Sequence, residues 1–265
     1  MIVEALVFAT QMTAPGARAN GIASEQAAIA ARYLRCQSQW RPHLENCRSF
    51  ILAGAEKARG SRRAVVLGSG CLLDIPLGGL SQRFEEVVLV DAAQPLHARL
   101  AARRLGNVRP VALSLVAMGP ASPVYRSWRG TVPQADYVVA SMLLSQLPPP
   151  GTASAGTDWR RDIISDALCD LCTEEEATCL ITETACNLSD SKGKAQAEDP
   201  LLGVAAPAAL KRWSWLLAPP GERPDGMVVE LDVCASLRAP GGRGWMAPKG
   251  PREATAAIAG GEEPR

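Results

Sequence analysis

The feature that most constrains the fold of this chain is a pair of short apolar runs. A glycine turn follows the first run, and an acid ends the second. Residues 64–67 form a continuous apolar run, as expected for a strand buried on both faces, and the run stops at residues 68–70. The second run, residues 87–90, ends at Asp91, which stands 21 residues after Gly70. Because adjacent parallel strands end at the same crevice, the turn and the acid are expected to face one ligand site.

The rest of the chain alternates between apolar runs and segments with helical periodicity, which is the pattern of a parallel α/β sheet. Further strands are expected at residues 107–113, 135–141, 177–183, 213–217 and 227–237. Helices are expected from Ser24 to before Pro42, from His43 to Gly60, briefly after Asp74, and at residues 95–105, 122–128, 159–171 and 201–210. The sequence therefore predicts an α/β fold with a doubly wound, mostly parallel seven-stranded sheet and a C-terminal antiparallel hairpin.

Residues 65–74 (Val-Val-Leu-Gly-Ser-Gly-Cys-Leu-Leu-Asp) and 87–91 (Val-Val-Leu-Val-Asp) resemble the first two motifs of class I S-adenosylmethionine-dependent methyltransferases. The resemblance extends more weakly from about residue 44 to 236. The family's glycine motif usually has a third glycine near position 72, where this chain has Leu72, and many relatives place an acid against the adenine in the region of Ser114.

The resemblance implies S-adenosylmethionine as the cofactor and an acceptor that is a small molecule or is unknown. The residues expected at the cofactor are Gly68, Ser69, Gly70, Asp91, Ala92 and Ser141. Asp91 would bind the ribose hydroxyls, and the glycines would shape the donor site. Ser141-Met142-Leu143-Leu144 lacks the Asn/Asp-Pro-Pro-aromatic pattern of the branch that methylates amino groups of nucleobases and glutamine. No general base stands out, so the catalytic residues stay unassigned.

Two other functions fit the same pattern. A methyltransferase-like fold that binds the donor or a related nucleoside without turnover, or that serves as an interaction module, is the first alternative. An NAD(P)-dependent oxidoreductase is the second, but the pyrophosphate motif requires glycine where Leu73 stands.

The chain divides into three parts on composition and resemblance. Residues 1–60, with an apolar start that predicts a strand or docking arm, are expected to form an N-terminal helical extension or lid. Residues 61–238 are expected to form the Rossmann-like methyltransferase domain. Residues 239–265 are rich in Pro, Gly, Ala and charge, which predicts a disordered tail.

The overall charge argues against partners that bind through a strong field. The 265 residues carry 28 Lys and Arg against 27 Asp and Glu, a net charge of +1, so no nucleic-acid or anionic-membrane partner is indicated. No apolar run approaches the length of a membrane span, and the first residues lack a basic leader and include Glu4. We expect a cytoplasmic protein, and its oligomeric state is left open.

Several other residue types invite a functional interpretation. Asp74, followed by Ile75 and Pro76, is predicted to cap a helix, with contact to a ligand's amino group as the alternative. His43 and His97 are expected at the surface or at helix ends, although His43 facing an acceptor stays open.

The eight cysteines and six tryptophans are expected to serve packing. Cys169 and Cys172 fall in a predicted helix and Cys179 in a predicted buried strand, so convergence of these residues with Cys186 on a metal ion is not expected. The tryptophans are expected in the core or at the sheet edges rather than in a substrate cage.

Overall fold

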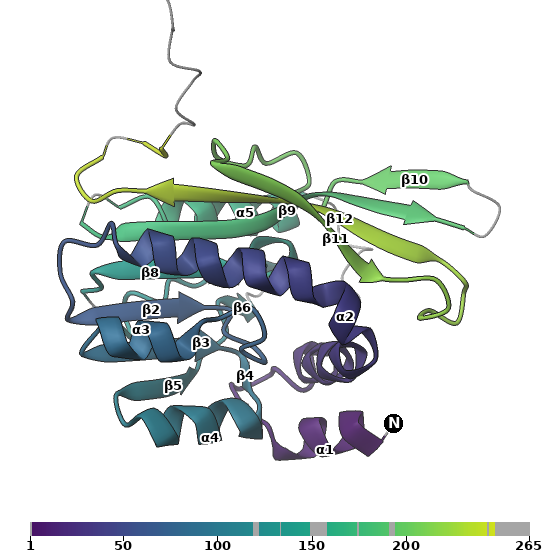
Figure 1. Ribbon diagram of the computed structural model, residues 1–265, viewed down its shortest axis with the longest axis horizontal. Helices are drawn as coiled ribbons and strands as arrows, with labels where there is room; N and C mark the ends of the chain where they lie inside the picture. Colours follow the sequence, from purple (N-terminus) through teal and green to yellow (C-terminus); the bar gives the residue numbers. More distant parts are fainter. Residues whose placement is uncertain are drawn as a thin grey trace, which may run out of the picture.

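The computed structural model describes residues 2–118, 122–132, 134–148, 158–173, 175–190, 194–242 and 244–246, and it is built around one central sheet (Figure 1). The sheet order is β11-β12-β9-β8-β2-β3-β5. Its strands are β2 (Arg63–Leu67), β3 (Glu86–Asp91), β5 (Val108–Ala112), β8 (Tyr137–Ser141), β9 (Ala177–Ser189), β11 (Lys211–Ala218) and β12 (Val228–Arg238).

The strand directions confirm the predicted fold class. Pairing is parallel from β5 through β3, β2 and β8 to β9, whereas β12 runs antiparallel to both β9 and β11. The chain therefore has the doubly wound, mostly parallel sheet with a C-terminal antiparallel hairpin of class I methyltransferase-like folds. The carboxyl ends of β2, β3 and β8 meet at one edge because these strands are parallel neighbours.

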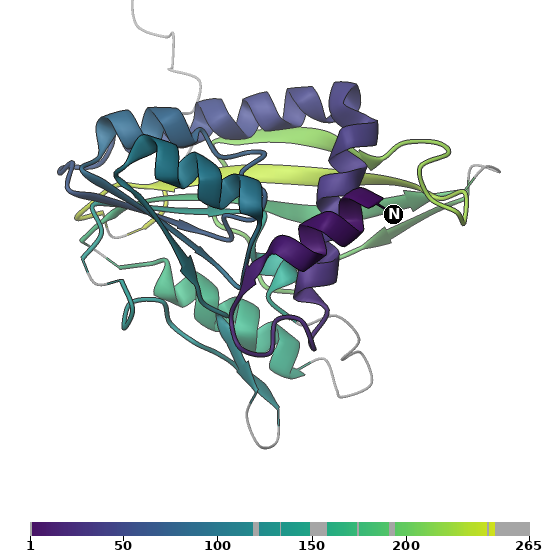
Figure 2. The same cartoon turned by 90° about the horizontal axis from the view of Figure 1, so that it is seen from below.

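Helices cover both faces of the sheet (Figure 2). On one face, α2 (Ile22–Ala55) and α3 (Leu77–Arg83) pack in a cluster with buried residues such as Val66, Leu89 and Ile181. On the other face, α5 (Asp158–Asp170) packs in a second cluster with Val65, Leu67 and Leu180. The helix α4 (Leu96–Leu105) precedes β5, as the sequence predicts. The alternation of side chains along β2 explains why consecutive valines belong to opposite clusters.

The prediction of two N-terminal helices, one on either side of Pro42, is wrong, because the two segments form the single helix α2. The helix kinks at Cys36, whose φ of −112° and ψ of 22° are not helical, and it continues through Pro42. Proline removes a hydrogen bond to the carbonyl four residues earlier, and here that residue is Ser38, which is exposed to water. Burial of Leu44, Cys47 and Ile51 beyond the proline stabilises the continuation.

Other element predictions fail where tertiary contacts or turn residues decide the backbone. Instead of a strand alone, the N-terminus forms α1 (Ile2–Thr10) and the two-residue strand β1 (Met12–Thr13), which pairs with β4 (Ala93–Gln94). The expected helix at 122–128 is a hairpin of β6 (Val116–Met118) and β7 (Pro123–Tyr125), where the Tyr125 hydroxyl donates to Asp170. The expected helix at 201–210 is absent because Gly203 has a φ of +82° and Pro207 follows.

The strand β9 continues past the end of β8 and carries the short strand β10 (Ala195–Glu198) on the freed edge, as Figure 1 shows. The polar segment 187–200 is therefore ordered in part as sheet, while residues 191–193 lie outside the described residues.

The chain beyond β12 stays in contact with the core as far as it is described. The Met246 backbone N–H donates to the Leu237 carbonyl at 2.7 Å, and Trp245 and Met246 each pack against a core cluster. The predicted disordered tail begins at residue 239, but these contacts show that Trp245 and Met246 still pack against the core. Residues 247–265, the rest of the predicted tail, lie outside the described residues.

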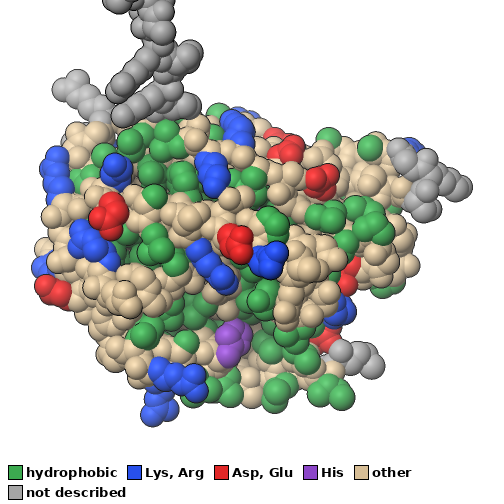
Figure 3. Space-filling view, viewed as in Figure 1, with side chains coloured by type: hydrophobic (Ala, Val, Ile, Leu, Met, Phe, Trp, Pro, Cys, Tyr) green, Lys and Arg blue, Asp and Glu red, His purple; other side chains and the backbone are tan. Residues whose placement is uncertain are grey.

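On the face shown in Figure 3, basic and acidic side chains are interspersed with apolar ones, as the balanced composition predicts. Among the described residues, no helix combines the length and apolar character required to cross a membrane.

Candidate functional site

The glycine turn after β2 is held open by backbone geometry that only glycine adopts readily. Gly68 and Gly70 have φ angles of +70° and +44°. The Gly68 N–H donates to the Val90 carbonyl at 2.9 Å, which ties the turn to β3. A Cβ atom on Gly68 would lie 3.0 Å from Leu143 Cδ1, so the turn also packs closely against the segment after β8.

Asp91 lies at the end of β3 and faces this turn, as predicted. Its Oδ2 accepts a hydrogen bond from the Gly70 N–H at 2.8 Å, and its Oδ1 accepts one from the Ala93 N–H at 2.9 Å. The Oδ1 also accepts from Gln26 Nε2 of α2 at 3.3 Å, so both carboxylate oxygens have partners within the protein. Burial raises the pKa of Asp91 to about 6, and the backbone hydrogen bonds from Ala93 and Gly70 offset part of that rise.

The neighbouring residues Ser69 and Ala92 contact other parts of the protein. The buried Ser69 hydroxyl accepts from Gln94 Nε2 at 3.3 Å, and the Ala92 carbonyl accepts from the Ala14 N–H at 2.8 Å. Gln94 is fully buried and also donates to the Leu89 carbonyl at 3.0 Å, while its Oε1 has no partner among the described residues. Gln94 was missed because a glutamine three residues after the end of β3 has no motif of its own.

Leu72 occupies the position where the resemblance places a third glycine, and its backbone is in the left-handed region with a φ of 58°. Met142, directly after β8, has a φ of 51°. Left-handed backbone is uncommon for residues other than glycine, and such strained positions cluster at functional sites. Leu72 follows the end of β2 and Met142 follows the end of β8, so both lie at the edge of the sheet where these strands end.

Asp74 and Ser141 form a second polar pair at this edge of the sheet. The Ser141 hydroxyl, on a side chain that is 3% exposed at the end of β8, donates to Asp74 Oδ2 at 2.5 Å. The prediction of Asp74 as a helix cap is wrong, because α3 begins at Leu77 and has no side-chain cap. Burial raises the pKa of Asp74, while the hydrogen bond from Ser141 and the charge of Arg48 act in the opposite direction.

Helix α2 contributes two polar side chains that the sequence did not point to. Gln26 reaches Asp91 through its amide nitrogen, and its Oε1 accepts from Cys71 Sγ at 3.4 Å. Arg48 Nη2 donates to the Leu73 carbonyl in the loop after the glycine turn. Neither could be found from a motif, since each lies on a helix that precedes the sheet and reaches the site only through packing.

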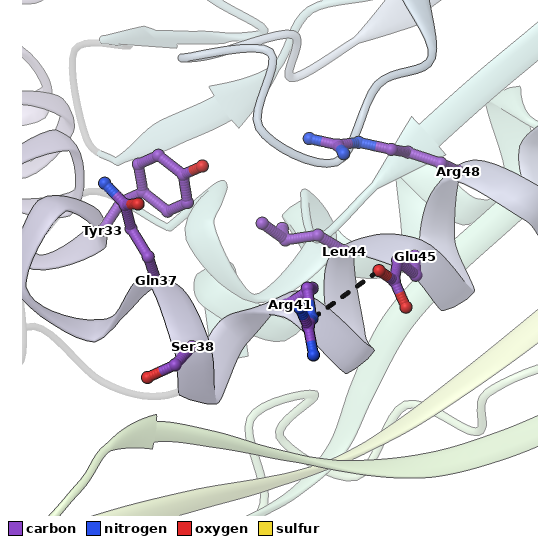
Figure 4. Close-up of a pocket in the computed structure, with 7 residues that line it drawn as sticks. All are labelled: Tyr33, Gln37, Ser38, Arg41, Leu44, Glu45 and Arg48. Atoms are coloured by element: carbon purple, nitrogen blue, oxygen red, sulfur yellow. Dashed lines mark ion pairs between the residues drawn. The ribbon is translucent and has the colours of Figure 1, made fainter.

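A cavity of about 460 Å³ lies along the kinked part of α2 (Figure 4). Its lining residues are Tyr33, Gln37, Ser38, Arg41, Leu44, Glu45 and Arg48. None of the six residues expected at the cofactor lines this cavity, although Arg48 connects it to the loop between Gly70 and Asp74.

The two histidines differ in their surroundings. His97 is exposed in the first turn of α4, as predicted, and its Nε2 donates to the Cys71 carbonyl at 3.0 Å. The prediction for His43 is wrong, because its side chain is 2% exposed and stacks on Trp215 with ring centroids 3.9 Å apart. Trp213 Nε1 donates to His43 Nδ1 at 3.0 Å, and burial lowers the pKa of His43 to about 3. His43 therefore joins α2 to β11 as a neutral ring.

The cysteines are spread over the fold. Cys36, Cys47, Cys71, Cys179 and Cys234 are buried, whereas Cys169 and Cys172 are exposed near the end of α5. Within the described ranges, no three His, Cys, Asp or Glu side chains are grouped as metal ligands would be. Trp40, Trp128 and Trp215 are buried, in agreement with the packing role predicted for the tryptophans.

A scan against protein-family models and a search of curated proteins gave no match. Among solved structures, this chain is similar to 1,6-didemethyltoxoflavin-N1-methyltransferase of Burkholderia thailandensis, with 14% identity over 84% of this chain and 91% of that one and a TM-score of 0.44. For a methyltransferase of Leishmania major, the identity is 17%, the coverages are 73% and 71%, and the TM-score is 0.36. For YcgJ of Bacillus subtilis, the values are 10%, 74%, 99% and 0.39. At these identities and scores, the fold assignment rests on the strand order of this chain itself.

Proposed function

We propose that this protein is an S-adenosylmethionine-dependent methyltransferase that acts on a small-molecule acceptor. The observation that carries the proposal is the 2.8 Å hydrogen bond between the Gly70 N–H and the Asp91 carboxylate. It joins a glycine turn to an acid across the carboxyl ends of two adjacent parallel strands. A nucleoside bound there would find backbone that permits close approach beside a carboxylate that accepts hydrogen bonds from two ribose hydroxyls.

The residues of the crevice divide the work of binding in this proposal. Gly68 and Gly70 keep the turn free of side chains, and Asp91 accepts from the ribose diol. Ser69 and Ala92, which follow β2 and β3, and Ser141, the last residue of β8, complete the rim. The bound cofactor supplies the methyl group on a positively charged sulfur. The chain's own part is to hold donor and acceptor in line, because correct positioning of two reactants lowers the barrier to their reaction.

The buried acids favour a cationic ligand at this edge of the sheet. Burial raises the pKa of Asp74 and of Asp91, which means that each carboxylate is poorly solvated when ionised. A positive charge nearby would lower the free energy of the ionised forms. The crevice therefore suits a sulfonium better than a second anion.

Gln26 holds the place that the ligand would take. Its amide nitrogen donates to Asp91 Oδ1, and a Cβ atom on Gly70 would lie only 3.1 Å from that nitrogen. The contact supports a role for Asp91 as an acceptor, and in this proposal a ribose hydroxyl would replace the Gln26 amide. Binding of the cofactor then requires Gln26 to move, at the cost of one hydrogen bond.

The same contact favours one alternative, which is an interaction module of methyltransferase-like fold that has no turnover. In that case Gln26, Gln94 and Ala14 would satisfy Asp91, Ser69 and Ala92 permanently as structural partners. The two functions differ in whether the protein binds S-adenosylhomocysteine, the demethylated product.

Calorimetric titration with S-adenosylhomocysteine tests the proposal. We expect wild type to bind, and Asp91→Ala to bind about ten- to a hundredfold more weakly, because charge-assisted hydrogen bonds are lost. Asp136→Ala is the matched control, since Asp136 also accepts backbone N–H bonds, from Arg62 and Arg63, but at the opposite end of β2. That variant should keep the wild-type affinity while its stability falls.

A folded wild-type protein that fails to bind S-adenosylhomocysteine at millimolar concentration would contradict the methyltransferase function and leave the interaction module. Titration with NAD and NADP in parallel covers the oxidoreductase, for which Leu73 is the unfavourable residue.

A further inference from the structure

The cavity at the kink of α2 is lined by the side chains of Tyr33 and Leu44, by two arginines and by three other polar residues. Figure 4 shows Tyr33 from the first half of the helix and Leu44 and Arg48 from the second half lying around a common space. Leu44 is 5% exposed and the half-buried Tyr33 packs against the same core cluster, so the core fixes the position of both side chains at the cavity. At about 460 Å³, the cavity lies in the size range of small-molecule sites.

Arg48 is the charged residue of this cavity lining that forms no ion pair with a described carboxylate. Its Nη2 donates to the Leu73 carbonyl, and no carboxylate among the described residues forms an ion pair with it. The nearby Asp74 feels its charge, but the carboxylate of Asp74 is engaged by the Ser141 hydroxyl. A half-buried guanidinium with donors to spare is a favourable partner for a carboxylate, whose two oxygens match its fork.

The other charged residues of the lining compensate one another. Arg41 and Glu45 form an ion pair at 3.8 Å, with side chains that are 78% and 65% exposed. Glu45 lies about one helical turn from Arg48 and Arg41 about two, and the pair contributes no net charge. The formal charge of the lining is therefore that of Arg48.

The cavity adjoins the proposed methyl-transfer site through the loop after the glycine turn. Arg48 is bonded to Leu73, and the next residue is Asp74, which bonds Ser141 at the end of β8. A ligand held by Arg48 is thus two hydrogen bonds and one peptide unit from the rim of the crevice. This position suits an acceptor rather than an unrelated ligand.

We propose that the cavity binds a small acceptor through a carboxylate held by Arg48, with the apolar body of the acceptor against Tyr33 and Leu44. The role of this ligand as methyl acceptor rests on the proposed function, whereas the binding of a carboxylate by Arg48 does not. A single negative charge balances Arg48. A phosphate would bring a charge of about −1.5 to −2 close to the buried Asp74 and to Glu45, which disfavours it.

Benzoate and its neutral analogue benzamide are suitable probes, titrated into the full chain by ligand-observed NMR. We expect wild type to bind benzoate about tenfold or more tightly than benzamide, and Arg48→Met to lose that preference. Arg48→Lys keeps a donor for the Leu73 carbonyl and should retain part of the preference. Arg41→Met, which removes an arginine of the same lining that is paired with Glu45, should change the benzoate affinity by less than about twofold.

Three outcomes would overturn the inference: no benzoate binding to wild type at millimolar concentrations, equal binding to wild type and Arg48→Met, or equal losses in Arg41→Met and Arg48→Met. Titration of the same variants with S-adenosylhomocysteine separates acceptor from cofactor. If Arg48→Met loses affinity for S-adenosylhomocysteine and keeps it for benzoate, Arg48 serves the cofactor and the inference is wrong. If wild type binds benzoate through Arg48 but not S-adenosylhomocysteine, the proposed function fails and this site stands.

Discussion

Leu72 keeps a turn that its side chain disfavours. Its φ of 58° costs about 1–2 kcal/mol for a residue with a Cβ atom. Two contacts offset this strain, since the Leu72 N–H donates to the Ser69 carbonyl at 2.9 Å and the side chain packs against the core cluster around β2. The turn thus forms with leucine in place of a third glycine, because burial of part of the leucine side chain offsets the backbone strain.

A branched Cβ at this position should expose the strain. We expect Leu72→Val to lower the free energy of unfolding by about 1–2 kcal/mol more than Leu73→Val, measured by urea denaturation. Leu73 is the matched control because it packs against the same cluster without a left-handed φ. Equal losses in the two variants would mean that the backbone at Leu72 is not strained.

His43 makes stability depend on pH through its burial. The pKa of about 3 in the folded protein lies below the ordinary value of 6.5, so the unfolded chain binds the proton more readily. The contribution of His43 is fully present above pH 6.5 and is lost as the pH falls toward 3. The buried acids Asp74, Asp91 and Glu183, whose pKa values are raised, act in the opposite sense, so only a comparison with a variant isolates His43.

We expect His43→Gln to lose less stability than wild type between pH 7 and pH 5, by about 2 kcal/mol. Glutamine keeps an acceptor for Trp213 Nε1 but does not titrate. Urea unfolding at both pH values gives the difference, and a wild-type pH dependence in the variant would show that His43 is protonated in the folded protein.

At the scale of elements, α2 has two halves with different anchoring. The half beyond the kink buries Trp40, Leu44 and Ile51, and Trp40 packs on Trp215 of β11 with ring centroids 5.0 Å apart. The half before the kink buries mainly alanines, each of which contributes little apolar area. Its bond from Arg35 to Glu222 at 2.6 Å involves an exposed arginine, and such pairs add about 0–1 kcal/mol. The first half is therefore the part that can move to admit a ligand.

Removal of the Gln26 side chain tests this difference. We expect Gln26→Ala to bind S-adenosylhomocysteine about two- to tenfold more tightly than wild type, since one hydrogen bond to Asp91 no longer has to be broken. Gln37→Ala, also on α2 but in the cavity lining, is the control and should leave this affinity unchanged. Weaker binding in Gln26→Ala would identify Gln26 as a ligand-binding residue instead of a competitor.

At the scale of the whole molecule, the packed chain ends later than composition indicates. Arg238 is 3% exposed and its Nη2 donates to the Gly242 carbonyl at 2.6 Å, so a buried guanidinium depends on the chain beyond β12. Trp245 and Met246 add apolar contacts to opposite faces of the sheet. Residues 239–242 and 244–246 thus belong to the folded unit.

Two truncations separate the packed segment from the rest of the tail. Deletion of residues 247–265 should leave the melting temperature unchanged, because their composition offers little apolar area to bury. Deletion of residues 240–265 should lower it by several degrees, since Arg238 loses its acceptor and Trp245 and Met246 lose their contacts. Equal melting temperatures for the two proteins would contradict the docking of Trp245 and Met246.

The sequence alone determined the sheet and the place of the site. Continuous apolar runs such as residues 64–67 and 87–90 can be buried only in the centre of a parallel sheet, and the glycine turn and Asp91 then face each other because parallel neighbours end together. The facing of the turn and Asp91 follows from strand order, which a pattern of residues reports directly, whereas the hydrogen bond from the Gly70 N–H to Asp91 is seen only in the structure.

Tertiary structure decided everything that depends on contacts between distant segments. Pro42 predicts the end of a helix, yet burial of the residues after it keeps α2 continuous, and the hydrogen bond that proline removes is at Ser38, an exposed residue. Asp74 has the sequence of a cap, but Ser141 lies 67 residues away and takes its carboxylate. Gln26 and Arg48 reach the site only because α2 packs across it. Such long-range contacts leave no periodicity in the sequence, since they depend on where the packed elements place each side chain.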